Sequence, residues 1–175
     1  MYGLAGRYED TTVSTKAVAI ARDDDRWRAF DLDPTELDDL DALTDAMRDL
    51  GDGVVVAFIE EDDEYLAIIR VDADSADPRV FLSDRRVLTT SELAEALFAD
   101  ALPVPAARTD EDDEDDEAVL QHAHPIGDLD LLDDLGTSSD ALISLIAEEG
   151  MLPADVAAAI SERAGAGEIL DEVRG

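Results

Sequence analysis

Residues 54–60 have the sequence Val54-Val55-Val56-Ala57-Phe58-Ile59-Glu60, which is apolar on both of its alternations. Alternate side chains of a β-strand point to opposite faces of the sheet, so a strand with this pattern is covered on both faces. We therefore predict that this strand lies near the centre of a sheet.

Further β-prone runs lie on both sides of this central strand. An acidic turn at Asp62-Asp63 leads into Tyr65 to Val71, and Arg79 to Ser83 follows as the next strand. Earlier in the chain, Lys16 to Arg22 and Arg26 to Leu32 are separated by three aspartates, a pattern that predicts a β-hairpin with an acidic turn.

Two helices are predicted from their capping patterns. Asp33 can cap a helix whose first residue is Pro34, and Thr89 with Glu92 has the spacing of a capping box. The first helix carries leucines and a methionine at spacings of three and four, and the second ends before Pro103.

The chain divides into four predicted parts. We expect a loose leader over residues 1–14, an α+β domain over 15–102, an acidic linker over 103–125 and a small all-helical region over 126–175. The α+β domain has an antiparallel sheet of about five strands and two helices. About 50 residues of short helices make a marginal core alone, so the last part either docks on the sheet or folds on a partner.

The charge of the chain is strongly negative. There are 46 Asp and Glu against 13 Lys and Arg, a formal net charge of −33, and Asp110 to Glu117 are consecutive acids. Binding to a phosphate backbone depends on Lys and Arg that displace counterions, so we expect no direct contact with nucleic acid. The charge indicates a basic protein partner, a salt-rich cytoplasm, or both.

The sequence also narrows the compartment and the chemistry. No stretch approaches the roughly 18 apolar residues of a membrane span, and the N-terminus lacks the pattern of a signal peptide. We expect a cytoplasmic protein without membrane contact. The chain has no cysteine, which excludes disulfides, thiolate zinc sites and a cysteine nucleophile.

Neither the acids nor the histidines have the spacing of a metal or catalytic site. The run Asp110 to Glu117 lacks the Gly and Glu positions of a calcium loop, so we interpret it as a solvated linker. His122 and His124 supply two ligands, fewer than a zinc site needs. We predict no cofactor, no metal and no enzymatic activity. A carboxylate-based, metal-dependent hydrolase is a weaker alternative.

Two groups of arginines could carry a positive surface. One group contains Arg79, Arg85 and Arg86, and the other contains Arg22, Arg26 and Arg28. The second group surrounds Trp27, which could stack on an RNA base. The alternative is that the arginines form internal ion pairs, and the net charge favours it. An exposed Trp27 would serve as an interface anchor.

The order of these parts resembles a known family. The resemblance is carried by Arg26-Trp27-Arg28, by Gly53-Val54-Val55-Val56, by the two strands that follow, and above all by Gly127-Asp128-Leu129-Asp130-Leu131-Leu132-Asp133-Asp134-Leu135-Gly136. In these features the chain resembles the tRNA adenosine deaminase-associated protein family of actinobacteria, over roughly residues 16–172.

This resemblance implies a non-catalytic companion of the deaminase that makes inosine at the tRNA wobble position. That zinc deaminase carries His-x-Glu and Pro-Cys-x-x-Cys signatures, and this chain has neither. The resemblance therefore supplies a partner and no catalytic residues.

We accordingly predict an accessory or interaction protein associated with tRNA adenosine deaminase. The candidate partner contacts are Trp27, Leu129, Leu131, Leu132 and Leu135. The leucine segment is favoured because its acids and leucines alternate, and its rival role is to pack the C-terminal region on the sheet. An RNA-contacting module that uses the Arg22 to Arg28 face is the alternative function.

Overall fold

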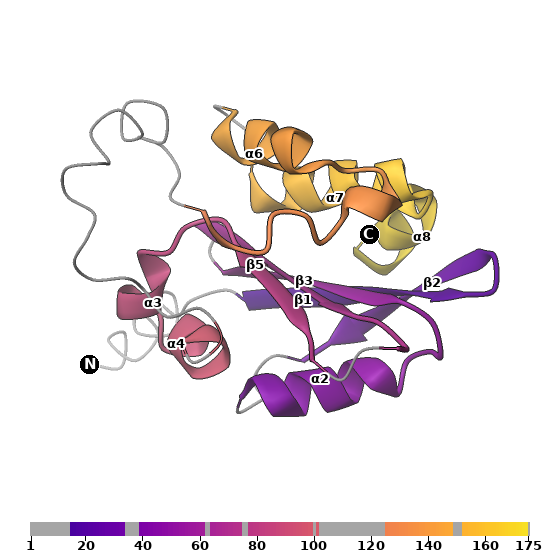
Figure 1. Cartoon of the computed structure of the whole chain (residues 1–175), viewed down its shortest axis with the longest axis horizontal. Coiled ribbons are helices and arrows are strands. Elements are labelled where there is room, and N and C mark those ends of the chain that lie inside the picture. The colour runs from indigo at the N-terminus through magenta and orange to yellow at the C-terminus, as the bar shows by residue number, and fades with distance from the viewer. Residues whose placement is uncertain are drawn as a thin grey trace, which may run out of the picture.

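The computed structural model describes residues 15–33, 39–61, 64–74, 77–99, 101, 125–148 and 152–174, which form one antiparallel sheet between two helical layers (Figure 1). The predicted leader, the acidic run Asp110 to Glu117, and His122 and His124 lie outside these residues. The α+β class predicted from the sequence is confirmed, with six strands in place of about five.

In chain order, the strands and helices are β1 (Thr15–Asp23), β2 (Arg26–Leu32), α2 (Leu40–Arg48), β3 (Val55–Glu61), β4 (Tyr65–Val71), β5 (Arg79–Leu82), α3 (Val87–Thr90), α4 (Glu92–Phe98), β6 (Ile126–Gly127), the 3₁₀ helix η2 (Asp133–Leu135), α6 (Ser139–Ala147), α7 (Pro153–Ala164) and α8 (Gly167–Arg174). The four strands predicted from Lys16 to Val71 are confirmed to within a residue or two at their ends.

The strand order in the sheet is β2-β1-β3-β4-β5-β6, and neighbouring strands are antiparallel. Strand β3 lies inside the sheet with every residue but its last buried, which confirms the central strand predicted from its two apolar alternations. One row of register partners crosses four strands and runs through Val18, Phe58, Ile68 and Phe81.

Helices α2, α3 and α4 cover what we call the first face of the sheet (Figure 1). Its core joins strand residues such as Ala57 and Ile69 to helix residues such as Leu43, Met47 and Phe98. The first face is therefore covered by helices that lie close in sequence to the strands they cover.

Of the two predicted helix starts, the one at Pro34 falls outside the described residues and the other is corrected by the structure. Residues 34–38 lie outside the described part, and α2 is capped by Asp39, whose carboxylate accepts from the Ala42 N–H at 2.9 Å. The capping box predicted at Thr89 is wrong, because Thr89 belongs to α3. Helix α4 is capped by Ser91, whose Oγ accepts from the Ala94 N–H.

A carboxylate ties the cap of α4 to the sheet. The Glu61 carboxylate accepts hydrogen bonds from the Tyr65 hydroxyl at 2.7 Å and from Ser91 Oγ at 2.5 Å. Burial is the main cause that raises the pKa of Tyr65, and the bond to Glu61 adds to it. Tyr65 therefore keeps its proton and acts as a donor.

Segment η2 and helices α6, α7 and α8 cover the opposite face, which we call the second face (Figure 1). Helix α7 contacts β3 and β4, α8 contacts β1 and β2, and α6 packs on α7. The C-terminal region therefore shares one hydrophobic core with the sheet, which is the docked alternative of the two that the sequence left open.

Strand β6 was not predicted, since two residues carry no periodic signal. It adds to the sheet beside β5, where Gly127 pairs with Phe81, and so brings the start of the C-terminal region onto the sheet edge. None of the helices in the described part is long and apolar enough to cross a membrane.

Candidate interaction site

Two arginines face each other on the second face of the sheet. Arg70 on β4 and Arg79 on β5 are register partners across antiparallel strands. Like charges directly opposite in a sheet repel each other, and a buried charge needs a partner of opposite sign. Since the Arg70 side chain is only 7% exposed, the sheet by itself leaves an unfavourable positive site.

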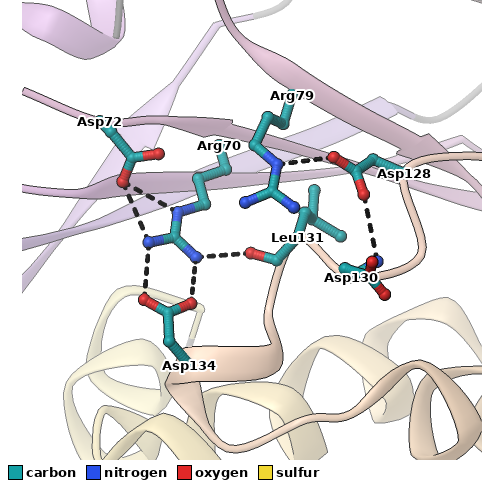
Figure 2. Close-up of polar contacts among 7 residues, drawn as sticks. All are labelled: Arg70, Asp72, Arg79, Asp128, Asp130, Leu131 and Asp134. Carbon is teal, nitrogen blue, oxygen red and sulfur yellow. Dashed lines mark hydrogen bonds and ion pairs between the residues drawn. The ribbon is translucent and has the colours of Figure 1, made fainter. Parts of the chain in front are cut away.

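One carboxylate from the C-terminal segment and one from the end of β4 neutralise Arg70 (Figure 2). Its guanidinium donates to both oxygens of Asp134, at 2.5 and 2.9 Å, and to the Leu131 carbonyl oxygen at 2.6 Å. Asp72, just beyond the end of β4, accepts from Nε at 3.1 Å and lies 3.0 Å from Nη2. Four of these five contacts are hydrogen bonds, and together the five engage all three nitrogen atoms of the guanidinium.

Arg79 is held by the same segment. Its Nε donates to the Asp128 carboxylate at 2.6 Å, and the other oxygen of Asp128 accepts from the Asp130 N–H at 3.1 Å (Figure 2). The Asp128 N–H in turn donates to the Val80 carbonyl. Asp128 therefore links the end of the sheet to the turn that leads into η2.

The ion pairs change the acid strength of both carboxylates. The hydrogen bond from Arg79 lowers the pKa of Asp128, and the bonds from Arg70 lower the pKa of Asp134. The same bonds raise the pKa values of the two arginines. All four groups are therefore charged at neutral pH, and Asp128 and Asp134 balance the charges of the two arginines. We call Arg70, Arg79, Asp72, Asp128 and Asp134 the arginine cluster.

Two glycines allow the segment to approach its neighbours. Gly127 has φ +112°, and a Cβ there would lie 2.3 Å from the Val80 carbonyl oxygen. Gly136 has φ +102°, and a Cβ there would lie 2.6 Å from the Arg163 carbonyl oxygen. Both positions need glycine because of the backbone conformation and because of the contact.

The leucines predicted as partner contacts lie against the sheet. Leu131, Leu132 and Leu135 are 0%, 1% and 7% exposed, and Leu129 is half-buried against the same core. This is the packing role that the sequence left open as the rival. As partner contacts they stay a prediction, and a partner could reach them only if the segment left the sheet.

Trp27, the fifth predicted contact, is half-buried between the hairpin and the C-terminal helices. Its Nε1–H donates to the Ala164 carbonyl oxygen at 3.0 Å, at the end of α7. The Arg22 guanidinium lies 5.8 Å from the centre of its ring, within the range of a cation–π contact. The ring therefore anchors α7 to the β1–β2 hairpin.

The arginine groups that could have bound RNA are largely engaged within the protein. Arg79 pairs with Asp128, Arg86 with Asp84 at 2.7 Å, and Arg28 with Asp23 at 3.3 Å. Arg79 and Arg86 are therefore each neutralised by a carboxylate of their own. Within the described residues, no group of three or more His, Asp or Glu is placed to hold a metal ion.

Arg70 is the site residue that we did not predict. Its signal in the sequence is a single charge inside Tyr65-Leu66-Ala67-Ile68-Ile69-Arg70-Val71, a strand that is otherwise apolar on both alternations. A buried arginine in such a strand requires carboxylates from elsewhere in the chain. Only the fold identifies Asp134, 64 residues away, as its partner.

The fold and this cluster define a three-layer α+β protein whose C-terminal layer is joined to the sheet by arginine–carboxylate pairs. The sequence of residues 15–167 matches the family described as Rv3753c-like tRNA adenosine deaminase-associated protein. The chain belongs to this family, which confirms the resemblance found from its motifs.

A curated relative is similar along most of its length. The chain is 33% identical over 141 residues to Protein Rv3753c of Mycobacterium tuberculosis (strain ATCC 25618 / H37Rv). The aligned region covers 79% of this chain and 74% of that protein. No solved structure matches this chain.

Proposed function

We propose that this protein is a cytoplasmic, non-catalytic accessory protein that binds tRNA adenosine deaminase directly through an acidic surface. The family's description names the deaminase as the associated protein, and the chain lacks that enzyme's cysteine signature. The observation that carries the proposal is the charge on the solvent side of the C-terminal layer.

That layer is almost free of basic residues. Residues 126–175 contain twelve Asp and Glu against two basic residues, Arg163 and Arg174. Two of the acids, Asp128 and Asp134, are used by the arginine cluster. The exposed acids that remain in the described part include Asp130, Asp133, Asp140, Glu148, Asp155, Glu162, Glu168, Asp171 and Glu172.

A surface with one sign of charge attracts a partner of the opposite sign and repels nucleic acid. Complementary charge raises the association rate, and its effect falls as salt screens it. We therefore expect the deaminase to contact this layer with a basic surface, and we expect no tight complex with tRNA alone.

Co-purification of the two full-length proteins tests the proposal. We expect a complex at about 50 mM salt that weakens by tenfold or more at about 500 mM, since screening shortens the range of these charges. The full chain must be used, because residues 126–174 supply ten of the seventeen buried residues of the second-face core, and their deletion would expose that face of the sheet. Absence of a complex at low salt would overturn the proposal.

A gel shift with tRNA under the same conditions distinguishes the alternative function, RNA binding, from the proposed one. Tight, salt-sensitive binding of tRNA without the deaminase would favour the RNA-contacting module that uses the Arg22 to Arg28 face. We expect no shift, because Arg28 is paired with Asp23 and the net charge repels phosphate.

A further inference from the structure

One leucine is presented to solvent on a rigid support. Leu152 is 47% exposed, and within the described part of the chain no other large hydrophobic side chain is exposed. It precedes α7, its N–H donates to the Asp155 carboxylate at 3.2 Å, and its carbonyl accepts from the N–H groups of Asp155 and Val156. The backbone of Leu152 is therefore fixed before any partner arrives, which lowers the ordering cost of binding.

Helix α6, the neighbour of this leucine in the chain, lies on the outside of the C-terminal layer (Figure 1). It packs on α7, which contacts the sheet, and buries Leu142 and Leu145. Ile143 and Ala147 lie one turn apart on α6, are only half-buried, and belong to neither core cluster. Helix α6 thus keeps apolar area that the core does not use.

Exposed acids lie close in the chain to these apolar residues. Asp140 at the start of α6, Glu148 at its end and Asp155 in the first turn of α7 are exposed. In the part of the chain that the structure describes, none of the three forms an ion pair. Moreover, the sequence has no Lys or Arg from Thr109 to Glu162, so no nearby stretch of chain offsets them.

An apolar centre with a charged rim is the usual anatomy of a protein interface. We infer that Ile143, Ala147 and Leu152, with the carboxylates of Asp140, Glu148 and Asp155, form a docking surface for a basic amphipathic segment of a partner protein. We name it the α6–Leu152 surface. The inference rests on the proposed function, in which that partner is the deaminase, and it adds where and by what chemistry the contact forms.

The apolar anchor can be removed without harm to the fold. Leu152 occupies the N-cap of α7, where serine is a preferred residue, so Leu152→Ser should preserve or raise the melting temperature. Loss of a buried leucine contact should weaken binding of the partner by about tenfold or more. A loss of binding therefore cannot be attributed to unfolding.

The rim is tested by neutralising its charge. The double variant Asp140→Asn, Glu148→Gln should weaken binding several-fold at low salt and little at high salt. Its matched control is the double variant Asp41→Asn, Asp45→Asn. These two exposed acids lie on α2, which packs on the first face of the sheet. The control should change binding by less than twofold.

Two probes are titrated against the wild type and these variants by calorimetry. One is the purified deaminase, and the other is a synthetic helical peptide with leucines at spacings of three and four and lysines elsewhere. We expect both to bind the wild type, and both to depend on Leu152 and on the α6 acids more than on the α2 acids.

The outcomes separate the two proposals. If the deaminase binds the wild type and all variants equally, the α6–Leu152 surface is wrong and the proposed function stands. If only the peptide binds, and does so through Leu152, the surface stands and the proposed function is wrong. If neither probe depends on Leu152, the inference is overturned.

Discussion

The two faces of the sheet are covered in different ways, although the same strands supply both. On the first face, α2, α3 and α4 lie close in sequence to the strands that they cover. The second face is covered by residues 126–174, which follow the last long strand after more than forty residues. Its neighbouring arginines pair with this distant segment, Arg70 with Asp134 and Arg79 with Asp128, although Asp72 at the end of β4 also contacts Arg70.

The polar contacts of the two faces differ accordingly. On the first face, the Glu61 carboxylate accepts from the hydroxyls of Tyr65 and Ser91, so one charge meets neutral donors. On the second face, Arg70 and Arg79 meet full negative charges that arrive with the segment. A covering layer that is distant in sequence is thus selected by charge as well as by apolar area.

The largest expected effect tests whether both faces belong to one cooperative core. Ile68 and Ile69 are adjacent on β4, are both fully buried, and point to the second and first face respectively. Truncation of either to alanine should lower the free energy of unfolding by about 3 kcal/mol, because each leaves a cavity. Urea unfolding, followed by circular dichroism and by fluorescence, measures the free energy of unfolding of both variants.

The fluorescence probe is specific to the second face, because Trp27 is the single tryptophan and bonds to the end of α7. We expect the two signals to coincide in both variants. An early fluorescence transition in Ile68→Ala alone would show that the C-terminal layer unfolds separately, as an independent domain would.

A smaller effect is expected from the arginine cluster. Arg70→Met keeps the length of the side chain and removes its charge, which strands the buried Leu131 carbonyl oxygen. The cost should be about 2 kcal/mol, below that of a fully buried pair, since Asp134 is 64% exposed and can return to water. The matched control Arg28→Met breaks a pair with Asp23 in which both side chains are about half exposed, and it should cost less than about 1 kcal/mol.

The same variant predicts a pH dependence with a definite sign. Because the arginines lower the pKa of Asp134 and Asp128 in the folded state, the unfolded state binds more protons at acid pH. Their stabilisation is present above the ordinary carboxyl pKa of about 4 and is lost as the pH falls through the lowered values. The difference in free energy of unfolding between wild type and Arg70→Met should therefore shrink below about pH 4. A difference that stays constant with pH would contradict the Arg70–Asp134 ion pair.

The smallest effect concerns the anchor between the hairpin and α7. Trp27→Phe keeps an aromatic ring but removes the N–H that donates to the Ala164 carbonyl. We expect a loss of about 1 kcal/mol, which calorimetric melting detects. An unchanged melting temperature would mean that this bond is exchanged for water without cost.

Much of the fold could be predicted because its signals are local. Tyr65 to Val71 was predicted with the bounds that β4 has, since its β-branched run ends at turn residues on both sides. Arg26 to Leu32 likewise has the bounds of β2. The cap of α4 was misplaced by two residues, because Thr89 and Ser91 are both suitable caps and only the preceding α3 decides between them.

The site was harder to predict because its partners are distant. The segment from Gly127 to Gly136 is the most specific part of the family resemblance, yet the sequence left its leucines between two roles, contact with a partner and packing on the sheet. The structure gives Asp128, Leu131 and Asp134 contacts within the protein. Alternation of acids and leucines is the same for either role.

The sequence by itself determined the α+β class, the central strand, the absence of cysteine and the family, because each depends on composition or on residues close together in the chain. Only the tertiary structure decided that the C-terminal region docks on the second face and that Arg70 and Arg79 hold it there. The physical reason is that a buried guanidinium can donate to any correctly placed carboxylate. In a chain with 46 acids, only the folded backbone decides which carboxylates are so placed.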